Sequence, residues 1–393
     1  MLCNIVLTIM QYIDKNVVME RQLKSLILKD LKRKMVFLTG PRQVGKTYLA
    51  KEIMTSFKSP IYLNYDQVKD ARTIQSQSWP LTADLLVFDE IHKMKDWKNY
   101  LKGIFDTRQP NQAILVTGSS RMETFRQTGA SLAGRYFHYR LYPFSVKEMT
   151  APDSANERLE KLNQLGGFPE PLLSDSEQEA SRWRNQYATD LIREDILDFS
   201  QIHEVRAMRL LLELLRSRVG SSLSYKSLAE DLQISPNTVK KYVSILESLY
   251  IVFLITPYHR NIARSILKEP KLYFYDTGMV NGDVGKQLEN TCAVSLLKHV
   301  HFLHDSQGTL VNLHYIRTKE GKEIDFVFTE AEELKMLIEV KTSDESPSKM
   351  LQSVHERFPA AEAVQLVQHL RQPKRDGSIQ IVNAGTWLSE LAA

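Results

Sequence analysis

The segment from Gly40 to Thr47 constrains this chain more than any other. It reads GPRQVGKT and matches the phosphate-loop pattern G-x-x-x-x-G-K-[ST] in full. The apolar run before it predicts a buried strand, and the residues after it predict a helix. The glycines let backbone N–H groups curl around a phosphate, and the helix N-terminus adds its dipole. The sequence therefore predicts a nucleoside triphosphate site.

The lysine and threonine of this loop have separate expected roles. Lys46 would reach the β and γ phosphates, and Thr47 would give its hydroxyl to Mg²⁺. A chance match within a structural turn is the alternative, and the flanking strand and helix argue against it. The expected cofactors are ATP and Mg²⁺. The expected nucleotide-binding residues are Gly40, Pro41, Arg42, Gln43, Val44, Gly45, Lys46, Thr47 and Tyr48.

A second apolar run, Leu85–Phe88, ends in two acids. Asp89 would hold Mg²⁺ directly or through water, and Glu90 would orient and polarise the attacking water. An acidic pair after a strand is often only a strand end that meets solvent. Its position downstream of a phosphate loop favours the catalytic interpretation.

Further candidates follow the next two predicted strands. Thr117 and Ser119 come directly after the apolar run Ala113–Val116, and either could contact the γ phosphate and the water; a plain Ser/Gly turn is the alternative. Arg135 precedes the alternating stretch Tyr136–Leu141. Its guanidinium could reach a phosphate in its own or a neighbouring subunit, and a surface ion pair is the alternative. A role across subunits would require a homo-oligomer.

These blocks together resemble the AAA-type ATPases of the AAA_14 kind over residues 20–150. GPRQVGKT, FDEIHK, VTGSS, LAGR and PFS followed by Glu148 occur in the order of that family. The resemblance implies an α/β fold with a five-stranded, mostly parallel sheet in the order 5-1-4-3-2, flanked by helices. It also implies ATP hydrolysis. The functional residues that it implies are Lys46, Thr47, Asp89, Glu90, Ser119 and Arg135.

The middle of the chain predicts two further units. Residues 151–223 have helical apolar spacing and are expected to form a helical linker or lid. Residues 224–280 are expected to form a winged helix-turn-helix, because Ser224 and Ser235 with Pro236 mark two helix starts and the apolar run 251–255 predicts a wing strand. Winged helices bind DNA or serve as packing modules. If this one binds DNA, the contacting residues are Asn237, Thr238, Lys240 and Lys241.

The last unit, residues 281–393, carries a charged pair of predicted strands. Glu339 and Lys341 lie two apart and point to one face, where Asp325 of the preceding strand could meet them. Asp325 and Glu339 would then bind Mg²⁺, and Lys341 would hold the water or stabilise the phosphorane charge. An exposed strand with alternating charges is the alternative.

This pattern resembles the PD-(D/E)XK nuclease-type site. LEN at 288–290, EIDFVF and LIEVKT are also similar to the DUF4143 domain that accompanies AAA_14 ATPases, over roughly residues 180–390. The resemblance implies a nuclease-like α/β domain with Glu289 as a further carboxylate. The proline of the motif name is absent, because Glu323 and Ile324 precede Asp325.

Composition limits the class of protein. The 393 residues suffice for two or three domains, and 43% are hydrophobic and 25% charged. A net charge of +4 does not by itself indicate nucleic acid, and two cysteines exclude a disulfide framework or a cysteine zinc site. No run approaches the ~20 apolar residues of a membrane span. We expect a cytoplasmic protein without a membrane segment, in which residues 1–18 are a leader and Met19 is an alternative start.

Two functional hypotheses follow. In the first, an ATP-hydrolysing AAA-type ATPase couples its nucleotide state to a C-terminal half that is nuclease-like and interacts with DNA, with Mg²⁺-dependent cleavage left open. In the second, the chain is a nucleotide-gated module that binds protein partners through a C-terminal docking domain without cleavage. The joint presence of Asp325, Glu339 and Lys341 favours a C-terminal site that works.

Overall fold

The computed structural model describes residues 19–118, 132–150, 153–191, 205–259, 269–318, 320–343 and 346–393. The expected leader and the candidate Ser119 lie outside the described residues. No helix in the described ranges is both long and apolar enough to cross a membrane.

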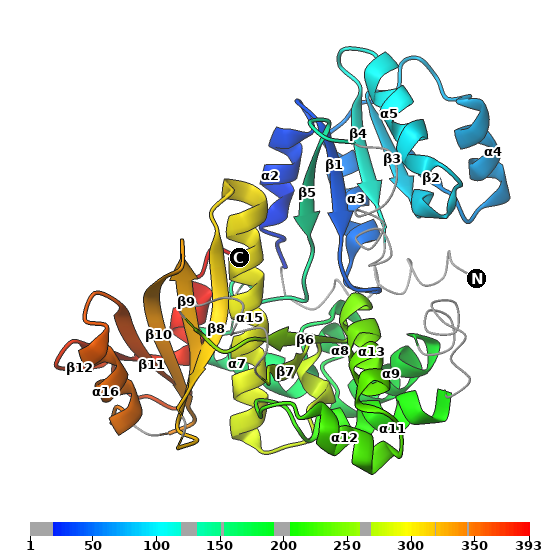
Figure 1. Ribbon diagram of the computed structural model, residues 1–393. Helices are drawn as coiled ribbons and strands as arrows, with labels where there is room; N and C mark the ends of the chain where they lie inside the picture. The colour runs from blue at the N-terminus through cyan, green and yellow to red at the C-terminus, as the bar shows by residue number, and fades with distance from the viewer. Residues whose placement is uncertain are drawn as a thin grey trace.

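The N-terminal part is a five-stranded parallel sheet in the order β2-β3-β4-β1-β5 (Figure 1), which confirms the predicted order. Side chains of β1 alternate between two apolar clusters, because successive residues of a strand face opposite ways. Helices α2 and α3 contribute to one cluster, and α4 and α5 to the other. The bounds are α2 Leu23–Asp30, β1 Met35–Thr39, α3 Lys46–Met54, β2 Pro60–Asn64, α4 Val68–Ser76, β3 Leu85–Asp89, α5 Trp97–Thr107, β4 Ala113–Thr117 and β5 Tyr136–Arg140.

The middle of the chain is helical, as the apolar spacing predicts. Ser154 begins α7 with a capping box to Glu157, and Ser235 caps α13 with Pro236 in its first turn. An antiparallel pair, β6 and β7, follows α12 and α13. The bounds are α7 Ala155–Leu165, α8 Pro169–Ser174, α9 Glu177–Asp190, α11 Val205–Arg216, α12 Tyr225–Leu232, α13 Pro236–Ser248, β6 Val252–Ile255 and β7 Lys271–Phe274.

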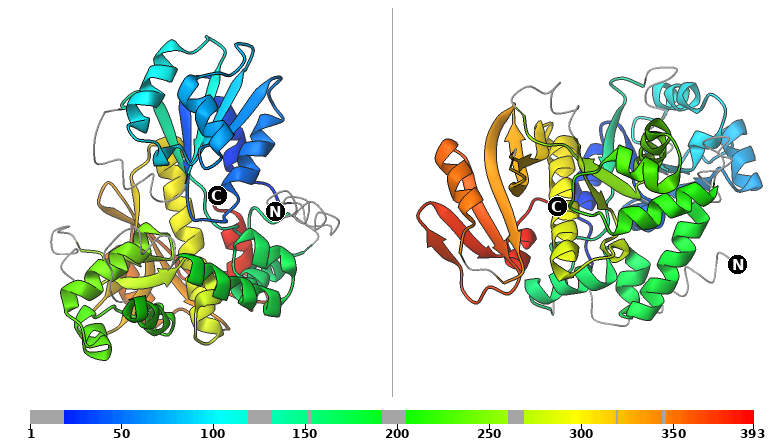
Figure 2. Two further views of the ribbon diagram at one scale, coloured as in Figure 1. Left: turned by 90° about the vertical axis from the view of Figure 1, so that its right-hand side faces the viewer. Right: turned by 60° about the horizontal axis from the view of Figure 1, so that its bottom comes forward.

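The C-terminal part joins one long helix to a mixed six-stranded sheet in the order β12-β13-β11-β10-β9-β8. Helix α15 is about 36 Å long at 1.5 Å per residue. It stands between this sheet and the helices α8, α9, α11, α12 and α13 (Figures 1 and 2). The bounds are α15 Val284–Gln307, β8 Val311–Arg317, β9 Glu323–Glu330, β10 Glu333–Lys341, α16 Lys349–Arg357, β11 Glu362–Val367, β12 Lys374–Asp376, β13 Ile379–Asn383 and α17 Ala384–Ser389.

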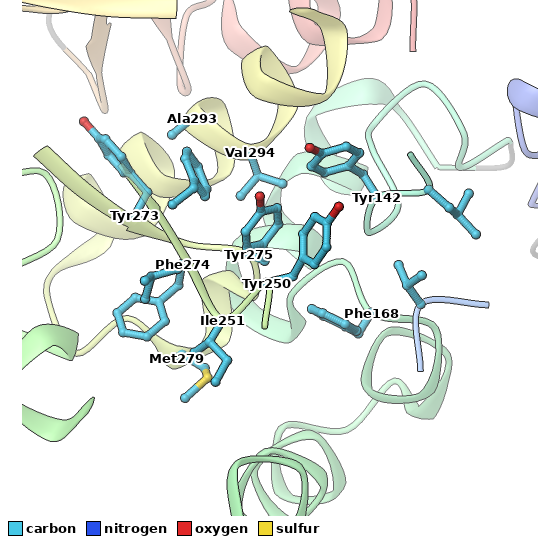
Figure 3. Packing of buried hydrophobic residues seen from close by; sticks show 14 of the residues in the cluster. Tyr142, Phe168, Tyr250, Ile251, Tyr273, Phe274, Tyr275, Met279, Ala293 and Val294 are labelled. Carbon is cyan, nitrogen blue, oxygen red and sulfur yellow. The ribbon is translucent and has the colours of Figure 1, made fainter. Parts of the chain in front are cut away.

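One apolar cluster continues through all three parts (Figure 3). At its centre the ring of Tyr142, just beyond β5, lies 6.5 Å from Tyr250 after α13 and 5.7 Å from Tyr275 after β7. Tyr250 and Tyr275 are 5.2 Å apart. The end of the N-terminal sheet is therefore anchored on the middle of the molecule by aromatic packing.

Candidate functional site

The predicted phosphate loop connects β1 to α3, and its two glycines have backbone conformations that other residues rarely adopt. The φ angles are +143° at Gly40 and +101° at Gly45. A Cβ atom on Gly40 would lie 2.2 Å from the carbonyl oxygen of Leu141, so no side chain fits there. The loop is thus a compact backbone turn that leads directly into the N-terminus of a helix.

Lys46 is the first residue of α3, and its side chain folds back over the loop. The ammonium group donates to the carbonyl oxygens of Gly40, at 3.0 Å, and Pro41, at 2.5 Å. Burial lowers the pKa of Lys46 to about 8, although Glu90 and Asp89 oppose that shift. A bound phosphate would compete with the two carbonyl groups for this ammonium.

Asp89, at the carboxyl end of β3, is buried and surrounded by hydroxyl donors. Thr47 donates to its Oδ2 at 3.3 Å, and Thr117 of β4 donates to its Oδ1 at 2.7 Å. Tyr62 of β2 also donates to Oδ2. The two expected Mg²⁺ ligands, Thr47 and Asp89, are therefore neighbours. Tyr62 was missed by sequence reasoning, because its place beside Asp89 follows only from the strand order.

Glu90 follows with a left-handed backbone, φ +55°. Its N–H donates to the carbonyl oxygen of Thr117 at 3.1 Å, and its carboxylate lies 3.4 Å from Nε2 of the buried His92. Burial and the neighbouring Asp89 raise the pKa of Glu90. A carboxylate with a raised pKa is a better proton acceptor than an ordinary one.

The structure separates Arg135 from this site. The N–H of Met35 donates to the Arg135 carbonyl at 3.0 Å, so Arg135 lies beside the start of β1, whereas the phosphate loop follows the end of that strand. Its guanidinium pairs with Asp106 of α5 at 2.9 Å. Because all strands are parallel, Arg135 does not reach a phosphate bound in its own subunit. Contact with a neighbouring subunit stays a prediction.

Helix α9 covers the phosphate loop, which the sequence did not predict. Trp183 donates its indole N–H to the side-chain oxygen of Gln43 at 2.7 Å, and the Tyr187 hydroxyl donates to the Arg42 carbonyl at 3.3 Å. The two rings stack with centroids 4.7 Å apart. Their spacing of four residues puts both on one helix face. That spacing was the only signal available in the sequence.

A buried chain of charges joins the loop to α15. Arg21 donates to the carbonyl oxygens of Val44, at 2.6 Å, and Tyr142, at 2.9 Å, and pairs with Glu148 at 3.0 Å. Glu148 also pairs with Lys298. Burial would raise the pKa of Glu148, but Lys298 and Arg21 together lower it. Burial lowers the pKa of Lys298 to about 8. Arg21 and Lys298 were not predicted as site residues.

Besides Lys298, two more residues of α15 contact the end of β5 and the segment that follows it. Asp305 pairs with Arg140 of β5 at 2.7 Å, and His301 bonds the hydroxyl of Tyr142. Positions 298, 301 and 305 lie on one side of a helix. The face of α15 defined by Lys298, His301 and Asp305 therefore receives the carboxyl end of β5 and the segment that follows it.

The predicted DNA-contacting residues occupy the first turns of α13. Asn237, Lys240 and Lys241 are exposed, and Thr238 is half-buried. The Thr238 N–H donates to the side chain of Ser235 at 3.1 Å, which caps the helix. Solvent therefore reaches three of the four candidates.

The structure brings Asp325, Glu339 and Lys341 to one end of β9 and β10. Ile338 pairs with Phe326, so Asp325 and Glu339 follow as cross-strand neighbours. Asp325 accepts the Val340 N–H at 2.9 Å, and Lys341 pairs with Glu339 at 2.9 Å. Ser348, the cap of α16, also donates to Glu339.

Glu289 has different partners. Tyr273 of β7 donates to it at 2.7 Å, and the Lys271 ammonium lies 3.4 Å away. The same ammonium lies 2.7 Å from Glu323 and 4.0 Å from Asp325. Burial and the nearby Glu289 raise the pKa of Asp325 to about 7, against the effect of Lys271. Lys271 was missed, because a lysine at the start of an apolar strand gives no signal of a site.

The expected set of three metal-binding carboxylates is not assembled. Across the ranges that the structure describes, no three His, Cys, Asp or Glu side chains gather as a metal site would require. The physical reason is Lys271, which holds Glu289 and Asp325 around an ammonium group, while Glu339 turns to Lys341. A metal held by Asp325 and Glu339 alone stays a prediction.

Comparison with family models divides the chain in three. Residues 32–150 match the AAA domain model AAA_14, 156–288 match the domain of unknown function DUF8612, and 284–387 match the domain of unknown function DUF4143. The predicted AAA_14 and DUF4143 regions are confirmed. The DUF4143 match begins at residue 284, and the expected helical and helix-turn-helix regions before it match the separate model DUF8612.

Several curated proteins are similar along most of the chain. An uncharacterised protein of Mycobacterium tuberculosis is 25% identical over 299 residues, 74% of this chain and 66% of that protein. One from Methanocaldococcus jannaschii is 26% identical over 350 residues, 79% and 76% of the respective chains. The chain thus spans just under two thirds of the mycobacterial relative.

Among solved structures, the Walker-type ATPase of Pyrococcus abyssi is 16% identical and covers 68% of this chain and 95% of its own, with a TM-score of 0.44. A RuvB structure from Thermotoga maritima is 18% identical and covers 60% and 87%, with a TM-score of 0.31.

Proposed function

We propose that this chain, in which an AAA_14 domain precedes a DUF4143 domain, binds ATP with Mg²⁺ and hydrolyses it at the phosphate loop. The observation that carries the proposal is the hydrogen bond between Thr47 and Asp89, at 3.3 Å, beside a loop whose two glycines have φ angles of +143° and +101°. Thr47 and Asp89 have the oxygen donors that Mg²⁺ prefers. The residues therefore fit the cofactor that the family implies.

Each side chain has a distinct task in this proposal. Lys46 binds the β and γ phosphates once its ammonium leaves the loop carbonyls, and Glu90 orients the attacking water and accepts its proton. Thr117 holds Asp89 in position from the neighbouring strand. Mg²⁺, when bound, neutralises the charge that develops on the phosphate oxygens.

Substituting Lys46 tests the site. Lys46→Ala removes the positive charge that binds the phosphates, so ATP turnover should fall to background while the thermal melting curve keeps its shape. The matched control is Lys69→Ala, an exposed lysine on α4 of the same domain. Turnover is measured as phosphate release. Unchanged turnover in Lys46→Ala would remove the site assignment.

The buried charges Arg21, Glu148 and Lys298 support a link between nucleotide state and the C-terminal half. Arg21 holds the carbonyl of Val44 in the phosphate loop, and Lys298 belongs to α15. A movement of the loop that displaces Arg21 must also change the pairing of Glu148. A contiguous network of this kind couples two sites if it can adopt two arrangements.

For the C-terminal half, contact with DNA is the first candidate function. The start of α13 is exposed and carries Lys240 and Lys241, and helices of this type read DNA from their first turns. Added duplex DNA should then raise ATP turnover. Indifference of the turnover to DNA of any form would count against a nucleic-acid partner.

Docking of a protein partner without cleavage is the second candidate. It is supported by the internal pairing of the C-terminal carboxylates with Lys271 and Lys341. In this case ATP sets the conformation in which the docking surface is presented. Metal-dependent nicking of a plasmid that disappears in Lys341→Ala would exclude it.

A further inference from the structure

Lys271 is a buried cation among acids. Only 1% of the residue is exposed, at the first position of β7. Its ammonium lies 2.7 Å from Glu323, 3.4 Å from Glu289 and 4.0 Å from Asp325. These acids come from α15 and β9, so two separate elements converge on the positive charge of a third, β7.

Each of the three carboxylates also has another protein donor. Tyr273 donates to Glu289 at 2.7 Å, Arg317 lies 3.2 Å from Glu323, and the Val340 N–H donates to Asp325 at 2.9 Å. A buried charge persists only where partners replace its water, and here both signs are satisfied by the protein itself. Glu289 Oε1, Asp325 Oδ2 and both oxygens of Glu323 are thus engaged by protein donors.

A divalent cation and the ammonium group would compete for one place. Mg²⁺ requires carboxylate oxygens at 2.0–2.1 Å in near-octahedral geometry. A metal that bridged Glu289 and Asp325 would lie against Lys271, and like charges at such a distance repel strongly when buried. Glu339 offers no free alternative, because Lys341 and Ser348 hold its two oxygens.

We propose that the Lys271 ammonium is the resident cation of this carboxylate cluster, in the place where a nuclease-like domain would bind a divalent metal. The C-terminal domain then holds no metal between Asp325 and Glu289 and does not cleave phosphodiesters there. This inference deepens the docking candidate for the C-terminal half, and it does not depend on ATP hydrolysis by the N-terminal domain.

The test counts bound metal on the full chain. Mn²⁺ binding without nucleotide is measured by the loss of the free-ion electron paramagnetic resonance signal. In the wild-type background, Asp325→Asn should leave the number of bound ions unchanged. Lys271→Met, which keeps the length of the side chain but not its charge, should bind one more ion per chain. That ion should be lost again when Asp325→Asn is added.

Two controls separate charge from packing. Lys271→Arg keeps a cation and should bind no additional ion. Lys335→Met removes an exposed lysine of β10 in the same sheet and should also have no effect. Lys271→Met should melt at a lower temperature than wild type, and Mn²⁺ should raise its melting temperature more than that of wild type.

Three results would overturn the inference. The first is a wild-type ion that disappears in Asp325→Asn, an arm that does not depend on the folding of any Lys271 variant. The second is a folded Lys271→Met that gains no ion. The third is plasmid nicking by wild type that requires both Mn²⁺ and Asp325. Phosphate release from ATP, measured on the wild-type sample, tests the proposed ATPase separately, because its absence would leave the metal counts unaffected.

Discussion

The backbone of Glu90 has a φ of +55°, a conformation that costs a non-glycine residue roughly 1–3 kcal/mol. The turn sends the chain away from β3 immediately after Asp89, so two adjacent acids take different environments. Asp89 is fixed by three hydroxyl groups, whereas Glu90 faces His92 at 3.4 Å. This division fits one acid for the metal and the other for the water.

The role of Glu90 as the water-orienting base can be tested by Glu90→Gln. It keeps the size of the side chain but cannot accept a proton, so kcat should fall by about 10²–10⁴-fold. Binding of a fluorescent ATP analogue should be retained, because Glu90 is not expected to hold the phosphates. Glu362→Gln, an exposed glutamate of β11, is the control. A kcat equal to that of wild type would assign the base elsewhere.

The titration of Lys46 predicts how kcat/KM for ATP hydrolysis depends on pH. Its pKa, lowered to about 8 by burial, means that the ammonium is lost from the free protein as the pH rises through about 8. The value of kcat/KM reports the free protein, so it should decline above that pH. Lys298 titrates in the same range, and Lys298→Met separates the two. If the decline disappears in Lys298→Met, Lys46 is not its source.

At the level of elements, α13 and α15 show which features can be predicted from the sequence and which cannot. The start of α13 was predicted because Ser235 and Pro236 are local signals, which require no knowledge of the rest of the chain. The contacts of α15 with the N-terminal part of the chain were not predicted. Lys298 and Asp305 contact residues more than 140 positions earlier, and no periodicity within a helix encodes such partners.

Substituting the exposed lysines of α13 tests whether this helix contacts DNA. If the helix contacts DNA phosphates, each of Lys240→Ala and Lys241→Ala should weaken binding and reduce the slope of log K against log salt by about one. The assay is fluorescence anisotropy of a labelled duplex at several salt concentrations. Lys349→Ala, an exposed lysine of α16, should keep the wild-type slope. Equal slopes in all variants would exclude contact through α13.

Across the whole molecule, the sequence predicted the strands around the phosphate loop well and the contacts between domains poorly. The phosphate loop, Asp89 and Glu90 are short contiguous motifs at strand ends, so the pattern and the strand order place them. Arg21, Trp183 and Lys271 act through contacts that only the folded chain creates. Arg135 was placed near the site by its family position, but the sheet puts it at the opposite end.

The buried chain of charges formed by Arg21, Glu148 and Lys298 predicts that Lys298→Met strongly destabilises the folded protein. Removing one partner of a buried ion pair costs on the order of 3 kcal/mol, because the other charge stays buried. The double variant Lys298→Met/Glu148→Gln should recover part of that loss. The free energy of unfolding is measured with urea, and Lys335→Met serves as an exposed control. If Lys298→Met has the same free energy of unfolding as wild type, the pair between Lys298 and Glu148 contributes little to stability.

The continuous apolar cluster around Tyr142, Tyr250 and Tyr275 has a consequence for how such a gene can be rearranged. A recombination that replaced either half would leave these rings facing an unrelated surface, open to water and prone to self-association. We therefore expect that the N-terminal and C-terminal parts can be exchanged between relatives only if the tyrosines that pack between them are exchanged as well.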